Sequence, residues 1–111
     1  MPSIALKDES RKLTGFLLVS GEEALAPAAK RACSFMVAPI PFVSPAKNVL
    51  VGRKQEFVVS IAEHEGGLLL VGECGPGELF EAHLPPEGLG AWTFTSGNTV
   101  VKGVCELAKR R

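Results

Sequence analysis

Apolar and polar positions alternate most clearly in the middle of the chain, between residues 55 and 84 (QEFVVSIAEHEGGLLLVGECGPGELFEAHL). Side chains along a strand point in turn to opposite faces, so Phe57, Val59 and Ile61 share one face, which we expect to be buried. The apolar runs are short and are bounded by Gly or Pro, which favours strands over helices. The pattern predicts an antiparallel meander of three strands, at residues 56–62, 68–73 and 78–84.

The turns of this meander also predict which residues lie opposite one another. Residues 75–77 (GPG) are suited to a three-residue loop, since Pro presets φ and Gly relieves steric restriction on either side. The pairs expected across that loop are Leu68 with Leu84, Leu69 with His83, Leu70 with Ala82, Val71 with Glu81 and Cys74 with Glu78. A four-residue loop is the alternative, and it would shift the register by one residue.

The residues before the meander give a less regular pattern. Residues 4–7 are expected to be either a short first strand or a disordered start, and 13–20 is a strand candidate with which such a first strand could form a hairpin. The alanine-rich stretch that follows predicts either a helix over 27–32, with Pro27 as its first residue, or a helical turn followed by a loop. Prolines punctuate residues 39–45, which we expect to be either an extended connection or a segment that covers a sheet edge. Residues 48–52 are a candidate short strand.

Two elements are expected after the meander. The aromatic residues of 91–95 predict a last strand. Residues 98–111 predict a helix, because apolar side chains recur at helical spacing and basic residues lie at its C-terminal end. Gly103 would cost this helix about 1 kcal/mol relative to alanine. The predicted fold is therefore α+β and a single domain over 1–111, with a meander or half-barrel of about five antiparallel strands and the helix packed on it.

Composition restricts the function classes. The chain has 111 residues, of which twelve are basic and twelve acidic, so bulk charge gives no electrostatic reason to expect nucleic acid or an anionic membrane as partner. No apolar stretch is long enough for a membrane span, and the N-terminus lacks a signal-peptide pattern. Three widely spaced cysteines do not form a disulfide framework, and they indicate a reducing compartment, which we expect to be the cytoplasm.

No convergent catalytic or metal-binding set is visible in the sequence. Cys74 is expected at an exposed turn, and the predicted meander places it roughly 30 Å from His64 and roughly 15 Å from His83, too far for a nucleophile and its base. The two histidines are expected at different heights of the sheet, so we predict no metal site. We likewise predict no cofactor and no catalytic residue.

The sequence therefore favours a small non-enzymatic interaction module that self-associates or holds a protein partner, because its apolar content is high for a small chain. A small-ligand-binding protein or small enzyme is the second hypothesis, with a pocket between the sheet and the C-terminal helix. Its ligand-binding candidates are Trp92, Phe94, Asn98 and Lys102. Weak nucleic-acid binding through scattered basic pairs is the third hypothesis and is disfavoured.

Overall fold

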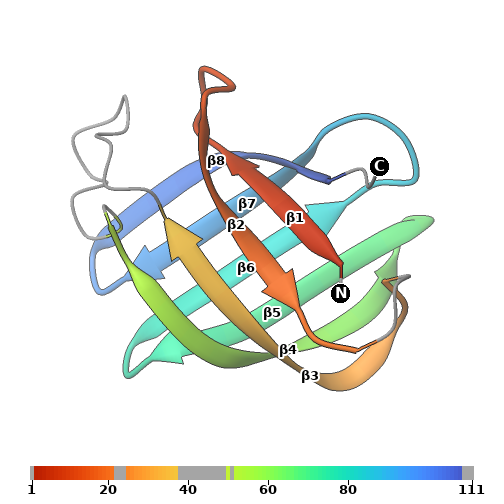
Figure 1. Cartoon of the computed structure of the whole chain (residues 1–111), viewed down its shortest axis with the longest axis horizontal. Helices are drawn as coiled ribbons and strands as arrows, with labels where there is room; N and C mark the ends of the chain where they lie inside the picture. Colours follow the sequence, from red (N-terminus) through yellow and green to blue (C-terminus); the bar gives the residue numbers. More distant parts are fainter. Residues whose placement is uncertain (1, 22–24, 38–49, 51, 109–111) are drawn as a thin grey trace.

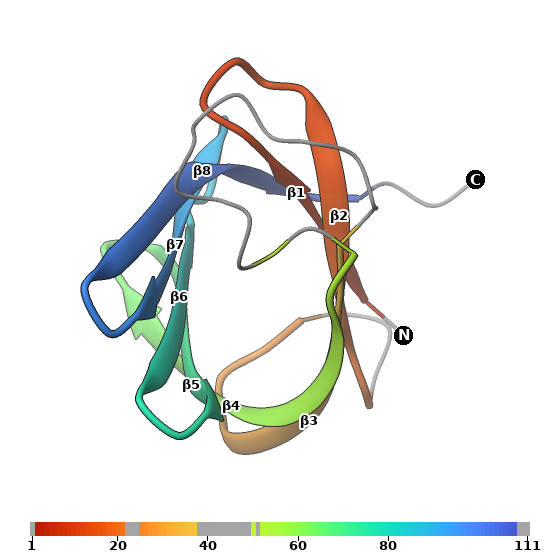
Figure 2. The same ribbon diagram turned by 90° about the vertical axis from the view of Figure 1, so that its left-hand side faces the viewer.

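All the regular structure that can be assigned is β-sheet. The computed structural model of the chain describes residues 2–21, 25–37, 50 and 52–108. Within them eight strands form a closed barrel in which each strand is hydrogen-bonded to the next along the chain (Figures 1 and 2). The strands are β1 (Ser3–Lys7), β2 (Leu13–Val19), β3 (Ala28–Val37), β4 (Lys54–His64), β5 (Gly67–Gly75), β6 (Glu78–Leu84), β7 (Gly90–Ser96) and β8 (Thr99–Leu107).

The last strand closes the barrel against the first. β8 pairs antiparallel with β1, from Ile4 opposite Leu107 to Lys7 opposite Val104, and it pairs with β7 on its other side. Closure leaves no strand with an unpaired edge, which removes the usual site of edge-to-edge aggregation. It also brings the end of β8 close to the start of the chain.

The predicted α+β fold is wrong, because the described residues form a closed barrel of eight strands and not a half-barrel of about five strands with a C-terminal helix packed on it. Residues 99–107 are a strand, and no described residue forms a helix that could cross a membrane. Val101, Gly103 and Cys105 alternate as buried positions, with exposed or half-buried residues between them. The β-branched residues of TVVKGVCEL suit this period of two as well as their apolar positions suit a helix, and hydrogen bonding to β1 and β7 stabilises the strand.

The helix predicted as one alternative over residues 27–32 is also wrong, because residues 28–32 are the first half of β3. The second half of β3 carries three side chains that are buried in the barrel, Cys33, Phe35 and Val37. Their burial overrides the helix preference of the alanines before them. The predicted edge segment 39–45 lies outside the described residues, as does most of the candidate strand 48–52.

The central meander is confirmed, with somewhat longer strands than expected. Its register is confirmed for the pairs from Leu68 with Leu84 to Val71 with Glu81. The expected pair of Cys74 with Glu78 is wrong, because a bulge between Glu73 and Gly75 places Gly75 opposite Glu78. The bulge inserts one extra residue into β5 at the turn, as bulges next to hairpin loops commonly do.

Aromatic side chains fill the inside of the barrel. The ring centroid of Phe35 lies 5.5 Å from that of Phe80, 6.2 Å from Phe94 and 6.4 Å from Phe57. Trp92 stacks on Phe80 at 6.3 Å and donates its indole N–H to the carbonyl of Lys7 at 2.9 Å. An eight-stranded barrel encloses just enough space for such side chains, so its interior is a packed core.

Polar contacts close the end of the barrel that carries the β5–β6 and β7–β8 turns. Arg53 forms a two-pronged ion pair with Glu78, and its guanidinium lies over the Phe94 ring, 5.0 Å from the centroid. The hydrogen bonds from Arg53 hold the pKa of Glu78 below its ordinary value, against the opposing effect of burial. Both side chains are about four-fifths buried, so this pair stabilises more than an ordinary surface ion pair would.

Candidate functional site

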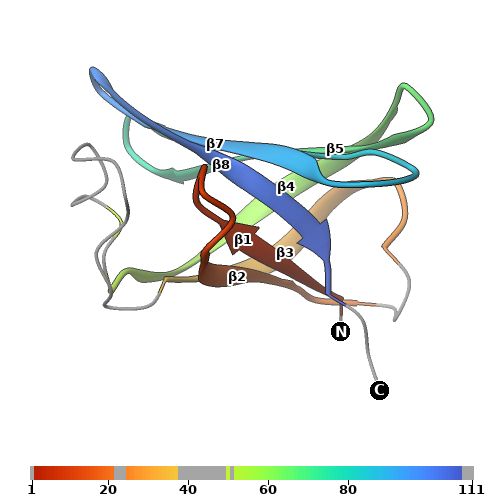
Figure 3. The ribbon, with the colours of Figure 1, turned by 90° about the horizontal axis from the view of Figure 1, so that it is seen from above.

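The opposite end of the barrel carries an open depression of about 870 Å³. Its lining residues come from the β4–β5 turn, the β6–β7 loop and the end of β8. The ribbons of these three elements are at the right in Figures 1 and 3. The volume falls within the range of small-molecule binding pockets. The lining residues are Leu25, Pro27, Glu63, Gly66, Gly67, Leu68, Leu84, Pro85, Pro86, Glu87, Gly88, Leu89, Glu106 and Leu107.

Apolar side chains and carboxylates together line this depression. Leu25 and Leu68 pack against the barrel core and form an apolar base. Among the described residues, the lining includes three glutamates and no Lys, Arg or His. Glu106 forms an ion pair with Lys7 at 2.5 Å, whereas Glu63 and Glu87 are exposed and make no ion pair with any residue that the structure describes. Within the described part of the chain, the depression therefore combines an apolar base with two exposed carboxylates that no basic residue pairs.

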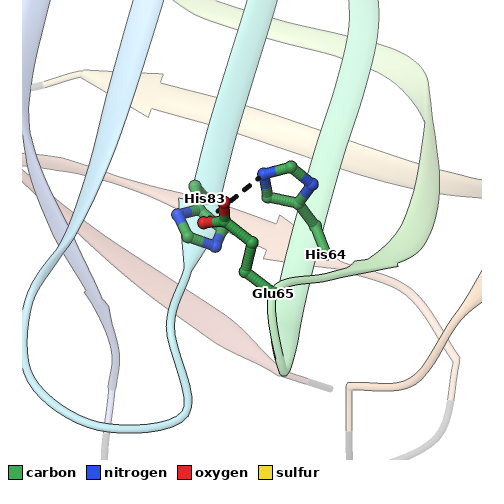
Figure 4. Close-up of side chains that lie close together, drawn as sticks. All are labelled: His64, Glu65 and His83. Atoms are coloured by element: carbon green, nitrogen blue, oxygen red, sulfur yellow. Dashed lines mark ion pairs between the residues drawn. The ribbon is translucent and has the colours of Figure 1, made fainter.

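Two imidazoles and a carboxylate gather beside this depression, on the outer surface of the sheet (Figure 4). The ring centroids of His64 and His83 are 5.0 Å apart, with the rings nearly perpendicular. His64 Nε2 lies 3.8 Å from a carboxylate oxygen of Glu65. The expectation that the histidines lie at different heights of the sheet is therefore wrong.

A two-residue turn between β4 and β5 explains this proximity. Glu65 and Gly66 both have positive φ, 51° and 81°, which is the pattern of a type I′ hairpin turn. With so short a turn, His64 pairs with Gly67, and Leu69 lies between Ala62 on one side and His83 on the other. Both histidines then project from the outer face on either side of β5, at levels two residues apart along it, and Gly67 places no side chain between them.

The histidine pair was missed although its signal is in the sequence. The register that places Leu69 opposite His83 follows from the second turn alone. Treating Glu65-Gly66 as a two-residue loop would have placed Leu69 opposite Ala62 and brought His64 near His83. The expectation is wrong because a single turn over all four residues from His64 to Gly67 does not specify which residues of the two strands lie opposite one another.

The predicted ligand-binding residues do not share a surface. Trp92 and Phe94 point into the barrel and are almost fully buried. Lys102, on β8, is exposed and lies opposite Thr93 of β7. Asn98 lies in the turn between β7 and β8. The pocket expected between a sheet and a helix loses its second wall, because residues 99–107 are a strand of the barrel.

The three cysteines point into the core of the barrel. Cys74 was expected at an exposed turn, but it is 4 % exposed, because the strand continues beyond it. Burial raises the pKa of the Cys33 and Cys105 thiols to about 12 and that of Cys74 to about 11. A thiol with such a pKa carries almost no thiolate near neutral pH and is a poor nucleophile.

Neither a known protein family, nor a curated protein, nor a solved structure significantly matches this chain. Many unrelated functions occur on barrels of similar architecture, so the fold alone does not indicate a function.

Proposed function

We propose that this protein is a non-enzymatic interaction module that binds a protein partner at the depression of the barrel end. The occupant would be a segment of the partner that carries both apolar and basic side chains. The proposal rests chiefly on the described lining of the depression, which combines an apolar base with three glutamates and, among the residues that the structure describes, no basic residue. The packed interior supports this location, since aromatic side chains fill the space that a ligand would need inside the barrel.

The two kinds of lining residue would have different roles. Burial of apolar side chains of the partner against Leu25, Leu68 and the neighbouring prolines would supply most of the affinity, at about 25 cal/mol per Å² of apolar surface removed from water. The exposed carboxylates of Glu63 and Glu87 would attract basic residues and reject acidic ones. Because they are exposed, their contribution would be modest and would weaken with salt.

A peptide-binding experiment tests this proposal on the full chain. Fluorescein-labelled octapeptides of alternating Leu and Lys, or of alternating Leu and Glu, are titrated with the protein and followed by fluorescence anisotropy. We expect the Leu/Lys peptide to bind preferentially and the double variant Glu63→Gln/Glu87→Gln to bind it about fivefold more weakly. The matched control, Glu56→Gln/Glu73→Gln, removes the same charge at exposed positions toward the other end of β4 and β5 and should leave binding unchanged.

Two results would contradict the proposal. One is equal binding of both peptides, and the other is equal weakening by the two double variants, which would indicate only long-range attraction. Light scattering adds a third check. A dimer that dissociates in the Glu63→Gln/Glu87→Gln variant would mean that a second copy of the chain occupies the depression, in place of a different protein.

We also propose that the protein acts in the cytoplasm. All three cysteines are unpaired and buried, as suits a reducing compartment. Nucleic-acid binding through the basic pairs remains the weaker alternative, and salt-sensitive retention on heparin would support it.

A further inference from the structure

We propose that His64, Glu65 and His83 form a binding site for a divalent transition-metal ion of the Zn²⁺, Ni²⁺ and Cu²⁺ class. Each of the three side chains offers one ligand atom, and these atoms all lie within 4.8 Å of one another. His64 projects from the end of β4, Glu65 from the turn and His83 from β6, and Figure 4 shows the carboxylate of Glu65 close to both rings. This proposal is independent of the peptide-binding depression and does not require a partner.

The geometry needs only a small contraction to hold an ion. With bonds of about 2.0–2.1 Å, the ligands of a tetrahedral zinc ion lie about 3.3 Å apart. No pair among the three atoms would then have to close by more than about 1.5 Å. The side chains of His64 and Glu65 are 47 % and 74 % exposed, so rotation about their own bonds can supply this movement without disturbing the core.

The state of His83 is an independent observation in favour of a ligand. Its Nε2 atom is buried and has no hydrogen-bond partner among the residues that the structure describes. Buried polar nitrogens are almost always paired, so an unpaired one in this cluster calls for an explanation. A metal ion between the two imidazoles would be coordinated by one ring nitrogen of each histidine. Coordination by Nε2 of His83 would give this buried atom a bonding partner.

The residue type at position 65 points the same way. Glu65 has φ of 51°, a left-handed conformation that glycine, asparagine and aspartate adopt far more readily than glutamate. A type I′ turn would be better served by Asn-Gly than by the Glu-Gly found here. Disfavoured backbone conformations persist where function requires them, and here a carboxylate oxygen of Glu65 lies within 4.8 Å of a ring nitrogen of each imidazole.

The ligand set defines the class of ion. Two imidazoles and one carboxylate suit Zn²⁺, Ni²⁺ and Cu²⁺, whereas Mg²⁺ and Ca²⁺ prefer sites made of oxygen atoms. Three protein ligands leave at least one coordination position for water or for a donor group from another molecule. Because His64 and Glu65 are exposed, that position would face solvent.

Titration of the full chain with ZnCl₂ tests the proposal, by calorimetry and by NMR of the imidazole protons. We expect one ion per chain, shifts of the signals of both histidines, and no comparable effect of MgCl₂. His64→Ala and His83→Ala should each weaken binding about tenfold or more. The control Glu81→Gln, an exposed carboxylate on the same strand as His83, should bind as tightly as the wild type.

Glu65→Asn separates metal binding from folding. Asparagine suits the left-handed turn position, so we expect this variant to unfold at a higher denaturant concentration than the wild type and yet to bind Zn²⁺ several-fold more weakly. Absence of Zn²⁺ binding by the wild type would overturn the proposal. So would binding that both histidine variants retain, or zinc-induced shifts that leave the imidazole signals unmoved. None of these results would bear on the peptide experiment.

Discussion

Replacement of Gly103 by alanine distinguishes the barrel from the helix that the C-terminal sequence predicts. Gly103 lies in the middle of β8, directly opposite Trp92 on β7. A Cβ atom at this position would lie 2.0 Å from the carbonyl oxygen of Lys7 on β1 and 2.5 Å from the indole nitrogen of Trp92. Glycine is therefore required where three strands of the closing seam come closest.

The cost of Gly103→Ala can be estimated from these distances. Carbon–oxygen contacts are comfortable at about 3.3 Å, so β1 and β8 would have to separate by about 1.3 Å at this point. Overpacking of this kind costs about 1–3 kcal/mol, and loss of the hydrogen bond from Trp92 to Lys7 costs about 1 kcal/mol more. We expect the free energy of unfolding to fall by about 2–4 kcal/mol and Tm by about 8–16 °C.

Urea unfolding followed by far-UV circular dichroism measures this change without relying on the perturbed tryptophan. Lys102→Ala, at the exposed neighbouring position, is the control and should change stability by less than about 0.5 kcal/mol. In a helix, Gly103→Ala would instead stabilise the protein by about 1 kcal/mol. An increase in stability would therefore refute the barrel at β8.

Three further predictions concern polar and thiol groups. Asp8→Ala should cost about 1–3 kcal/mol, because Asp8 accepts hydrogen bonds from Ser10 and from the Lys12 amide. Burial opposes ionisation of Asp8, but these bonds hold its pKa below the ordinary value. The stabilisation that they provide is therefore present above about pH 4 and is lost as pH falls through the folded pKa. Acid unfolding of the wild type and of Asp8→Ala checks this. Arg53→Met should cost about 2–3 kcal/mol in urea unfolding, and Glu78→Gln in the same chain should restore part of it, because the unpaired carboxylate is removed. Ellman's reagent at pH 8 should label no thiol in the folded protein and all three in urea, and rapid labelling of the folded protein would contradict the buried positions. The free energy of unfolding should also fall as pH rises from the ordinary thiol pKa of 9.0 towards the folded pKa values of about 11–12.

The sequence predicts the middle of the barrel well because the decisive information there is local. Glycine and proline mark the turns, and alternation identifies Phe57, Val59 and Ile61 as core residues, all of which are buried. The register of β5 and β6 follows from one loop length, apart from the bulge next to Gly75. Neighbouring strands joined by short turns require no knowledge of the rest of the chain.

The strands that the sequence misses depend on partners far along the chain. The apolar residues of 99–107 fit a period of 3.6 as well as a period of two, and the pairing with β1 that decides between them joins residues about a hundred positions apart. The same holds for the alanines at the start of β3, whose pairing with β4 crosses a long connection. The His64–His83 cluster was missed for a smaller reason, the length assigned to a single turn.

The depression at the barrel end depends on closure of the barrel by β8, because closure places Glu106 and Leu107 beside the β6–β7 loop. Nuclear Overhauser effects between backbone protons test this closure by NMR. We expect cross-strand effects between residues 4–7 and 104–107, with Ala5 opposite Glu106. Strong amide-to-amide effects between successive residues over 99–107, together with effects between residues three apart, would indicate a helix and contradict the closed barrel.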